Sequence, residues 1–121
     1  MIALGTTLRC NLPPRHLWVV LSDPRQTGDA ILLVSLTTLR DGCVDDVCIL
    51  DAPDFPGYLT HATTVAYSRA KAGSANALAE SVAKGSFTIV SPIPQSTLSK
   101  IIDGARKSDE LSASNKKLLP P

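Results

Sequence analysis

Short apolar runs of strand length, separated by turn-forming residues, make up most of the first two-thirds of this chain. The run 17–21 ends at a Ser-Asp-Pro turn, and the run 30–36 follows a polar connection that contains Gly28. Such runs, bounded by Gly, Pro, Asp or Ser, predict strands, and two of them around a Gly-containing connection predict a hairpin. Further strands are expected at 47–50, 61–67 and 86–90. The chain is therefore expected to be mainly β.

The apolar period changes near the C-terminus. Leu98, Ile101, Ile102 and Ala105 follow the i, i+3, i+4, i+7 spacing of an amphipathic helix, which predicts a helix over about 95–106. Shorter helices are expected over 75–84 and from Ser108 onward. The predicted fold is a small β-barrel or curled sheet capped by C-terminal helices. We expect one domain over 1–121, with the barrel at about 4–92 and the helical segment at about 94–118.

Charge and composition exclude few functions. The chain has 121 residues, of which 44% are apolar, and a formal net charge of +1. No apolar run approaches the ~20 residues of a membrane-spanning helix, and no signal peptide is recognisable, so we expect a cytoplasmic protein without membrane contact. Residues 1–60 carry a net charge of −3 and residues 61–121 a net charge of +4. The basic half is either a solvated helical surface or a face that attracts phosphates.

Metal binding has little support in the sequence. Three cysteines, an odd number, disfavour a disulfide framework. Cys43, Cys48 and His61 are the best candidate ligands, but no second pair with metal-binding spacing accompanies them. The aspartates between them lack the spacing of a calcium loop and are interpreted as a solvated acidic loop; they are Asp45, Asp46, Asp51 and Asp54. We expect no metal and no other cofactor.

The order of these segments resembles the PemK/MazF-like toxin family over most of residues 4–107. A Gly-led entry segment at 5–9 precedes the strand that ends in Leu21-Ser22, and the run 31–38 ends in Thr37-Thr38. The strand at 61–67, then Gly85 and the C-terminal helix, complete the pattern. The resemblance implies an SH3-like barrel, a homodimer, an antitoxin protein as partner, and metal-independent endoribonuclease activity on single-stranded RNA.

One stretch differs from the pattern of that family. Members commonly carry a glutamine-valine-arginine-threonine type stretch on the strand after the long loop, and its arginine stabilises phosphate. The matching stretch here is 64–68, so Tyr67 falls near the arginine, while Ser68 matches the hydroxyl. Arg69 lies two positions later, where an altered strand register could bring it into the site. The missing arginine keeps an alternative open: a catalytically silent barrel that binds nucleic acid or protein.

Metal-free RNA cleavage needs a base for the 2′-hydroxyl, an acid for the leaving oxygen and cations for the phosphate. The two histidines, His16 and His61, each begin a predicted strand, and imidazole titrates near neutral pH. They are the candidate proton-transfer pair, or else ordinary strand-edge residues. Arg15 and Arg69 are the candidate phosphate ligands, because a guanidinium binds phosphate bidentately.

Two residues of the matching stretch are candidates for substrate binding. Tyr67 could stack on a base, or else belong to the core, and Ser68 could donate its hydroxyl. Trp18, inside an apolar run, is expected in the core. The sequence thus predicts a toxin-type endoribonuclease whose catalytic residues are His16, His61, Arg15 and Arg69.

Overall fold

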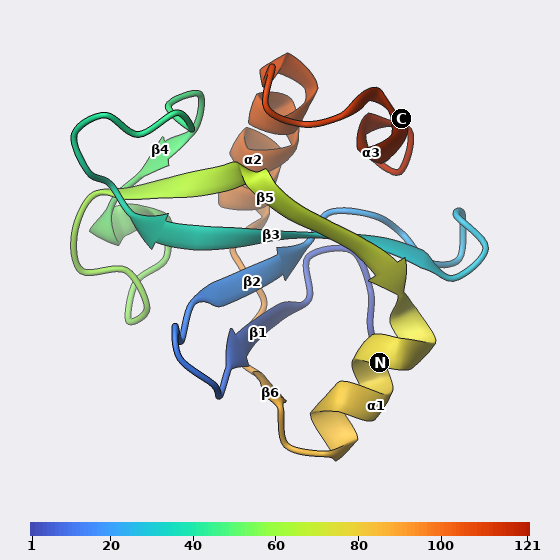
Figure 1. Cartoon of the computed structure of the whole chain (residues 1–121). Helices are drawn as coiled ribbons and strands as arrows, with labels where there is room; N and C mark the ends of the chain where they lie inside the picture. Colours follow the sequence, from blue (N-terminus) through green and yellow to red (C-terminus); the bar gives the residue numbers. More distant parts are fainter.

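Six strands, two longer helices and two short helical turns make up the protein, whose computed structural model describes residues 1–121. Figure 1 shows the elements in chain order. They are β1 (Thr7–Cys10), β2 (Leu17–Val20), β3 (Ala30–Thr38), β4 (Ile49–Leu50), the 3₁₀ turn η1 (Ala52–Asp54), β5 (Thr63–Ser74), α1 (Ala75–Ala83), β6 (Phe87–Ile89), α2 (Gln95–Lys107) and α3 (Ala113–Lys116).

All strands belong to one antiparallel sheet with the order β4-β5-β3-β2-β1-β6. The predicted hairpin is present: β2 pairs with β3, Leu17 opposite Leu36 and Val20 opposite Leu33. The mainly β fold with C-terminal helices is therefore confirmed. The expected barrel is not closed, however, because the end strands β4 and β6 do not pair with each other.

Alternate residues of β3 point to opposite faces of the sheet, as the two-residue period of a strand requires. Each face contributes to its own apolar cluster. The larger cluster includes Leu32, Val34, Leu36, Leu98, Ile101 and Ile102, and the smaller one includes Ile31, Leu33, Ala75 and Leu78. Helix α2 thus covers one face, while α1 covers only one end of the other face (Figure 1).

Two segments differ markedly in extent from the sequence-based expectation. Strand β5 runs to Ser74 rather than ending near residue 67, and Ser74 then caps α1 by accepting a hydrogen bond from the amide of Ala77 at 3.0 Å. The expected helix after Ser108 is reduced to the four residues of α3. Helix α2 matches its predicted range within one residue. None of the helices is both long and apolar enough to cross a membrane.

Candidate functional site

The half of the sheet face that α1 leaves open carries small and polar side chains. On β3, Ser35 and Thr37 continue the same face as Ile31 and Leu33, but beyond the reach of the smaller apolar cluster. Ser35 lies opposite Ala66 of β5, so two small side chains are adjacent in the middle of the sheet. The result is two hollows on this face and a third at the adjoining end of the sheet, and His16 lines all three.

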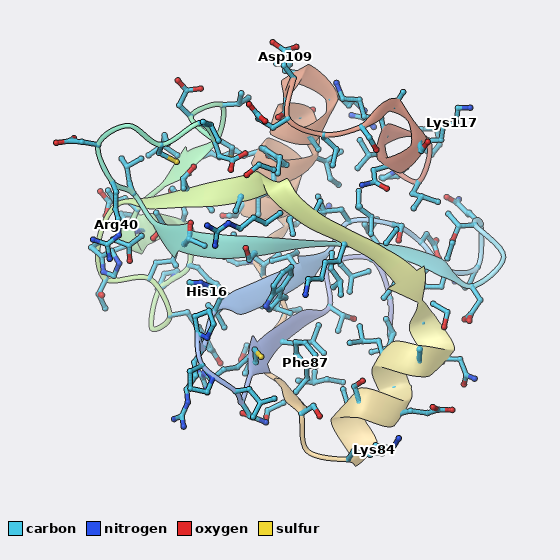
Figure 2. All side chains as sticks on the ribbon, viewed as in Figure 1. His16, Arg40, Lys84, Phe87, Asp109 and Lys117 are labelled. Atoms are coloured by element: carbon cyan, nitrogen blue, oxygen red, sulfur yellow. The ribbon has the colours of Figure 1, made fainter.

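The main cleft has a volume of about 440 Å³ and lies between this face and the loop 39–48. His16 lines it from the segment before β2 and Thr37 from β3, while Arg40 comes from the loop and Arg69 from β5. In Figure 2, Arg40 and His16 lie on the same side of the molecule. Two guanidinium groups thus border one cleft, an arrangement suited to an anion.

A β-bulge places Arg69 in the cleft. Leu33 of β3 pairs with Lys71, and two residues later Ser35 pairs with Ala66, so five positions on β5 match two on β3. Bulges re-aim side chains in this way. The bulge shifts the register of β5 against β3, and Arg69 lines both the main cleft and the neighbouring hollow beside Trp18.

A smaller hollow of about 190 Å³ brings together Arg15, His16 and His61. The His61 ring is held at both nitrogens: Nε2 lies 2.9 Å from Oγ1 of Thr38, and Nδ1 lies 3.0 Å from Oγ1 of Thr60. Hydroxyls both donate and accept, so these bonds persist in either charge state of the ring. The two predicted proton-transfer residues therefore border one hollow, with Thr38 between the main cleft and His61.

The cations around these hollows are free of acidic partners. The protein has three ion pairs, Arg25 with Asp23, Lys100 with Asp54 and Arg106 with Asp103. None involves Arg15, Arg40, Arg69 or Lys71, and all four of those side chains are exposed. Unpaired, exposed cations on one face attract anionic ligands such as phosphates.

Asp45 is the one acidic side chain buried at the cleft, with 5% exposure. Its carboxylate accepts hydrogen bonds from the Ser68 amide, at 2.9 Å, and from the Ser68 hydroxyl, and its backbone carbonyl accepts one from the Thr64 hydroxyl. The expectation of a solvated acidic loop is therefore wrong at Asp45. These bonds tie the loop that carries Arg40 to β5.

Tyr67 does not lie in the site, which corrects its assignment as a base-contacting residue. Its side chain is 1% exposed and packs in the larger cluster, where its hydroxyl donates to the Ile101 carbonyl of α2 at 2.6 Å. Burial raises the pKa of Tyr67 far above its ordinary range, so the phenol remains a donor. Ser68, the next residue, points to the other face and lines the main cleft, although its hydroxyl is engaged by Asp45.

The sequence missed three residues that line the cleft, Thr37, Thr38 and Arg40. The threonines were visible as a Thr-Thr pair at a strand end, but strand propensity explains that pair equally well. The position of Arg40 depends on the fold of the loop 39–48, for which the sequence holds no signal.

No group of three or more His, Cys, Asp or Glu side chains is arranged to hold a metal ion. Burial also raises the pKa of the Cys48 thiol, which disfavours the thiolate that metal binding needs.

Neither a protein-family model nor a curated protein sequence matches this chain. Solved structures do match. A chain of the crystal structure of MazE-MazF (Form-II) from Deinococcus radiodurans aligns with a TM-score of 0.55 and 14% identity, covering 92% of this chain and 97% of that one. An endoribonuclease from a mycobacterial species aligns with a TM-score of 0.58 and 18% identity, covering 91% and 92%. The resemblance predicted from the sequence is thus confirmed for the architecture: this chain has the fold of these MazE-MazF and endoribonuclease structures.

Proposed function

We propose that the protein is a toxin-type endoribonuclease that cleaves single-stranded RNA without a metal ion. The observation that carries this proposal is the clustering of both histidines and three unpaired arginines around two hollows that share His16, Thr37 and Thr38 at one end of the sheet. The fold shared with the mycobacterial endoribonuclease supports the same reaction class. A shared fold alone would also fit a binding module, so the proposal depends on the side chains.

The proposed reaction uses the RNA's own 2′-hydroxyl as nucleophile. One imidazole, of His16 or His61, removes the 2′-proton while the 2′-oxygen attacks phosphorus. The bond from phosphorus to the 5′-oxygen breaks, and the other imidazole supplies the proton that this oxygen needs, leaving a 2′,3′-cyclic phosphate. Arg15 and Arg69 bind the phosphate and stabilise the charge that develops on it, and Arg40 adds a third cation.

Assembly follows from the same proposal. The Deinococcus structures are MazE-MazF complexes, which supports an antitoxin protein as partner of this chain. We further propose a cytoplasmic homodimer, with residues 1–121 forming one domain in each subunit. Light scattering tests the dimer: a mass of 12.8 kDa, that of one chain, at all micromolar concentrations would contradict it.

The decisive experiment incubates purified protein with end-labelled single-stranded RNA in EDTA. We expect cleavage with a bell-shaped pH dependence, because one imidazole must be neutral and the other protonated. His16→Ala and His61→Ala should each lower the rate by about 10² or more, the scale for losing a general acid or base. Full activity in both variants would exclude the proton-transfer pair. Binding of RNA without any cleavage would instead favour the silent binding module.

A further inference from the structure

Next to the main cleft, a third hollow of about 310 Å³ contains the chain's single tryptophan. Trp18 and Phe87 line it with aromatic rings, and Lys71 and Arg69 line it with cationic groups. Ser35, on the strand β3 between β2 and β5, also lines it. His16 and Arg69 also line the main cleft, so the two hollows are continuous at these residues. We call this depression the Trp18 hollow.

The Trp18 hollow exists because of the residues paired across the sheet. Trp18 of β2 lies directly opposite Ser35 of β3, and Ser35 lies opposite Ala66 of β5. Cross-strand partners share a face, so one large ring stands beside two small side chains. Trp18 was expected in the core, but it is only half-buried: part of the ring packs against the smaller apolar cluster and part borders the hollow.

Ser35 supplies a hydroxyl at the bottom of the Trp18 hollow. The residue as a whole is 1% exposed, yet it lines the hollow. Its side chain shares the face of Trp18, because the two residues are directly opposite each other on β3 and β2. The protein has no buried side-chain nitrogen or oxygen atom without a hydrogen-bond partner, so the fold does not require a ligand at this position. A hydroxyl can both donate and accept, so a ligand atom in the hollow can hydrogen-bond to it.

The charges around the Trp18 hollow select an anionic ligand. No acidic residue lines it, whereas Lys71 and Arg69 do and both are exposed. The Lys71 ammonium lies 5.4 Å from the centre of the Trp18 ring, a cation–π contact. Its long, flexible side chain can move from the ring to a phosphate when another π-face occupies the hollow.

We propose that the Trp18 hollow binds one nucleobase of the single-stranded RNA whose phosphate lies at Arg69. Every part of a nucleotide has a counterpart here: aromatic walls for the base, the Ser35 hydroxyl for its edge, and the two cations for its phosphate. The volume is at the small end of the ~300–1,000 Å³ typical of ligand pockets. This inference rests on the proposed function, since it assigns a base-binding subsite to the same RNA.

The test compares two single-stranded hexanucleotides of equal charge, both uncleavable 2′-O-methyl RNA, one with bases and one abasic at every position. Binding is measured by anisotropy of an end label and by the emission of Trp18, which reports on this hollow alone. We expect the base-bearing oligomer to quench Trp18 and to bind about 5- to 150-fold more tightly, the scale of stacking one base on an aromatic side chain.

Variants of Ser35 sharpen the comparison. Ser35→Ala removes the hydroxyl but keeps the space, so affinity for the base-bearing oligomer should fall a few-fold. Ser35→Val fills the space with a residue that suits a strand, and should lower that affinity to the level of the abasic oligomer. Neither change should alter abasic binding. Lys84→Met removes a cation at the far end of α1, away from the hollows (Figure 2), and should alter neither affinity.

The outcomes separate this proposal from the proposed function. If both oligomers bind equally and Trp18 emission is constant, the protein contacts only phosphates, and the base subsite is refuted while RNA binding stands. If neither oligomer binds, both proposals fail. Circular dichroism and thermal unfolding of each variant show whether it is folded, and Trp18 quenching in the wild-type protein decides the proposal even if Ser35→Val does not fold.

Discussion

Replacing Gly104 by alanine tests how closely α2 packs on the sheet. A methyl group there would overlap the Tyr67 hydroxyl and would lie 3.0 Å from Cβ of Cys48 and 3.2 Å from Cζ of Tyr67. Alanine is a better helix former than glycine by about 0.8–1.0 kcal/mol, so in an exposed helix the change would stabilise the protein. Helix propensity and packing therefore predict opposite signs at this position.

The packing effect should be the larger one. Forcing an extra methyl group into a filled core destabilises by about 1–3 kcal/mol. Moving the Tyr67 hydroxyl away also weakens its 2.6 Å hydrogen bond to the Ile101 carbonyl, and an unsatisfied buried polar group costs about 1–3 kcal/mol. After the gain in propensity is subtracted, we expect Gly104→Ala to lower the free energy of unfolding by about 2–3 kcal/mol, measured by urea denaturation.

A double-mutant cycle identifies the cause of that loss. Tyr67→Phe alone should destabilise by about 1 kcal/mol through the lost hydrogen bond. In that background the methyl group of Gly104→Ala meets no hydroxyl, so its effect should be smaller by at least about 1 kcal/mol. A Gly104→Ala variant as stable as the wild type, or two effects that simply add, would refute the close contact. Tyr67→Phe should leave oligonucleotide affinity unchanged, because the ring lies in the core.

Three further predictions concern the cleft and its surroundings. Asp45→Ala should destabilise the protein by about 2–4 kcal/mol in urea denaturation, since the Ser68 amide and hydroxyl lose a charged acceptor, whereas the isosteric Asp45→Asn should lose less. Arg69→Met should reduce the slope of log affinity for single-stranded RNA against log salt by about 0.7, with Lys84→Met as the control that leaves it unchanged. Lys100 holds the pKa of Asp54 below its ordinary value, so this pair stabilises the fold above the ordinary aspartate pKa of about 3.9, and the effect disappears as the pH falls through the lowered pKa. Lys100→Met should therefore be less stable than the wild type at pH 7, and thermal unfolding should show the difference shrinking in acid.

Strands β2 and β3 and helix α2 were predictable because each has a simple apolar pattern, whereas β1 was not predicted as a strand. The runs that became β2 and β3 have strand length and turn residues at both ends, and the stripe from Leu98 to Ala105 has helical spacing. The second half of β5 lacks such a pattern, because residues 68–70 lie in the bulge and residues 71–74, three of them exposed, pair with β3 without an alternation of apolar and polar side chains. Its extent could therefore not be read from hydrophobic alternation.

The side of the sheet on which Tyr67 lies could be predicted from the sequence, whereas the positions of Asp45 and Arg69 could not. Val65 and Tyr67 are two residues apart on one strand, so they share a face, and the apolar Val65 marks that face as buried. The burial of Asp45 depends on a loop that folds back onto β5 over a separation of 23 residues. Long-range contacts of this kind leave no local signal in one sequence.

Sheet topology explains why the site residues come from distant parts of the chain. Because β3 lies between β2 and β5, residues that flank one end of these three strands become neighbours: His16 before β2, Thr38 at the end of β3 and His61 before β5. Helix α1 covers the other end of this face and does not extend to the end where these residues lie. The protein thus keeps part of the sheet open beside unpaired cations, and this is the surface to which we propose that single-stranded RNA binds.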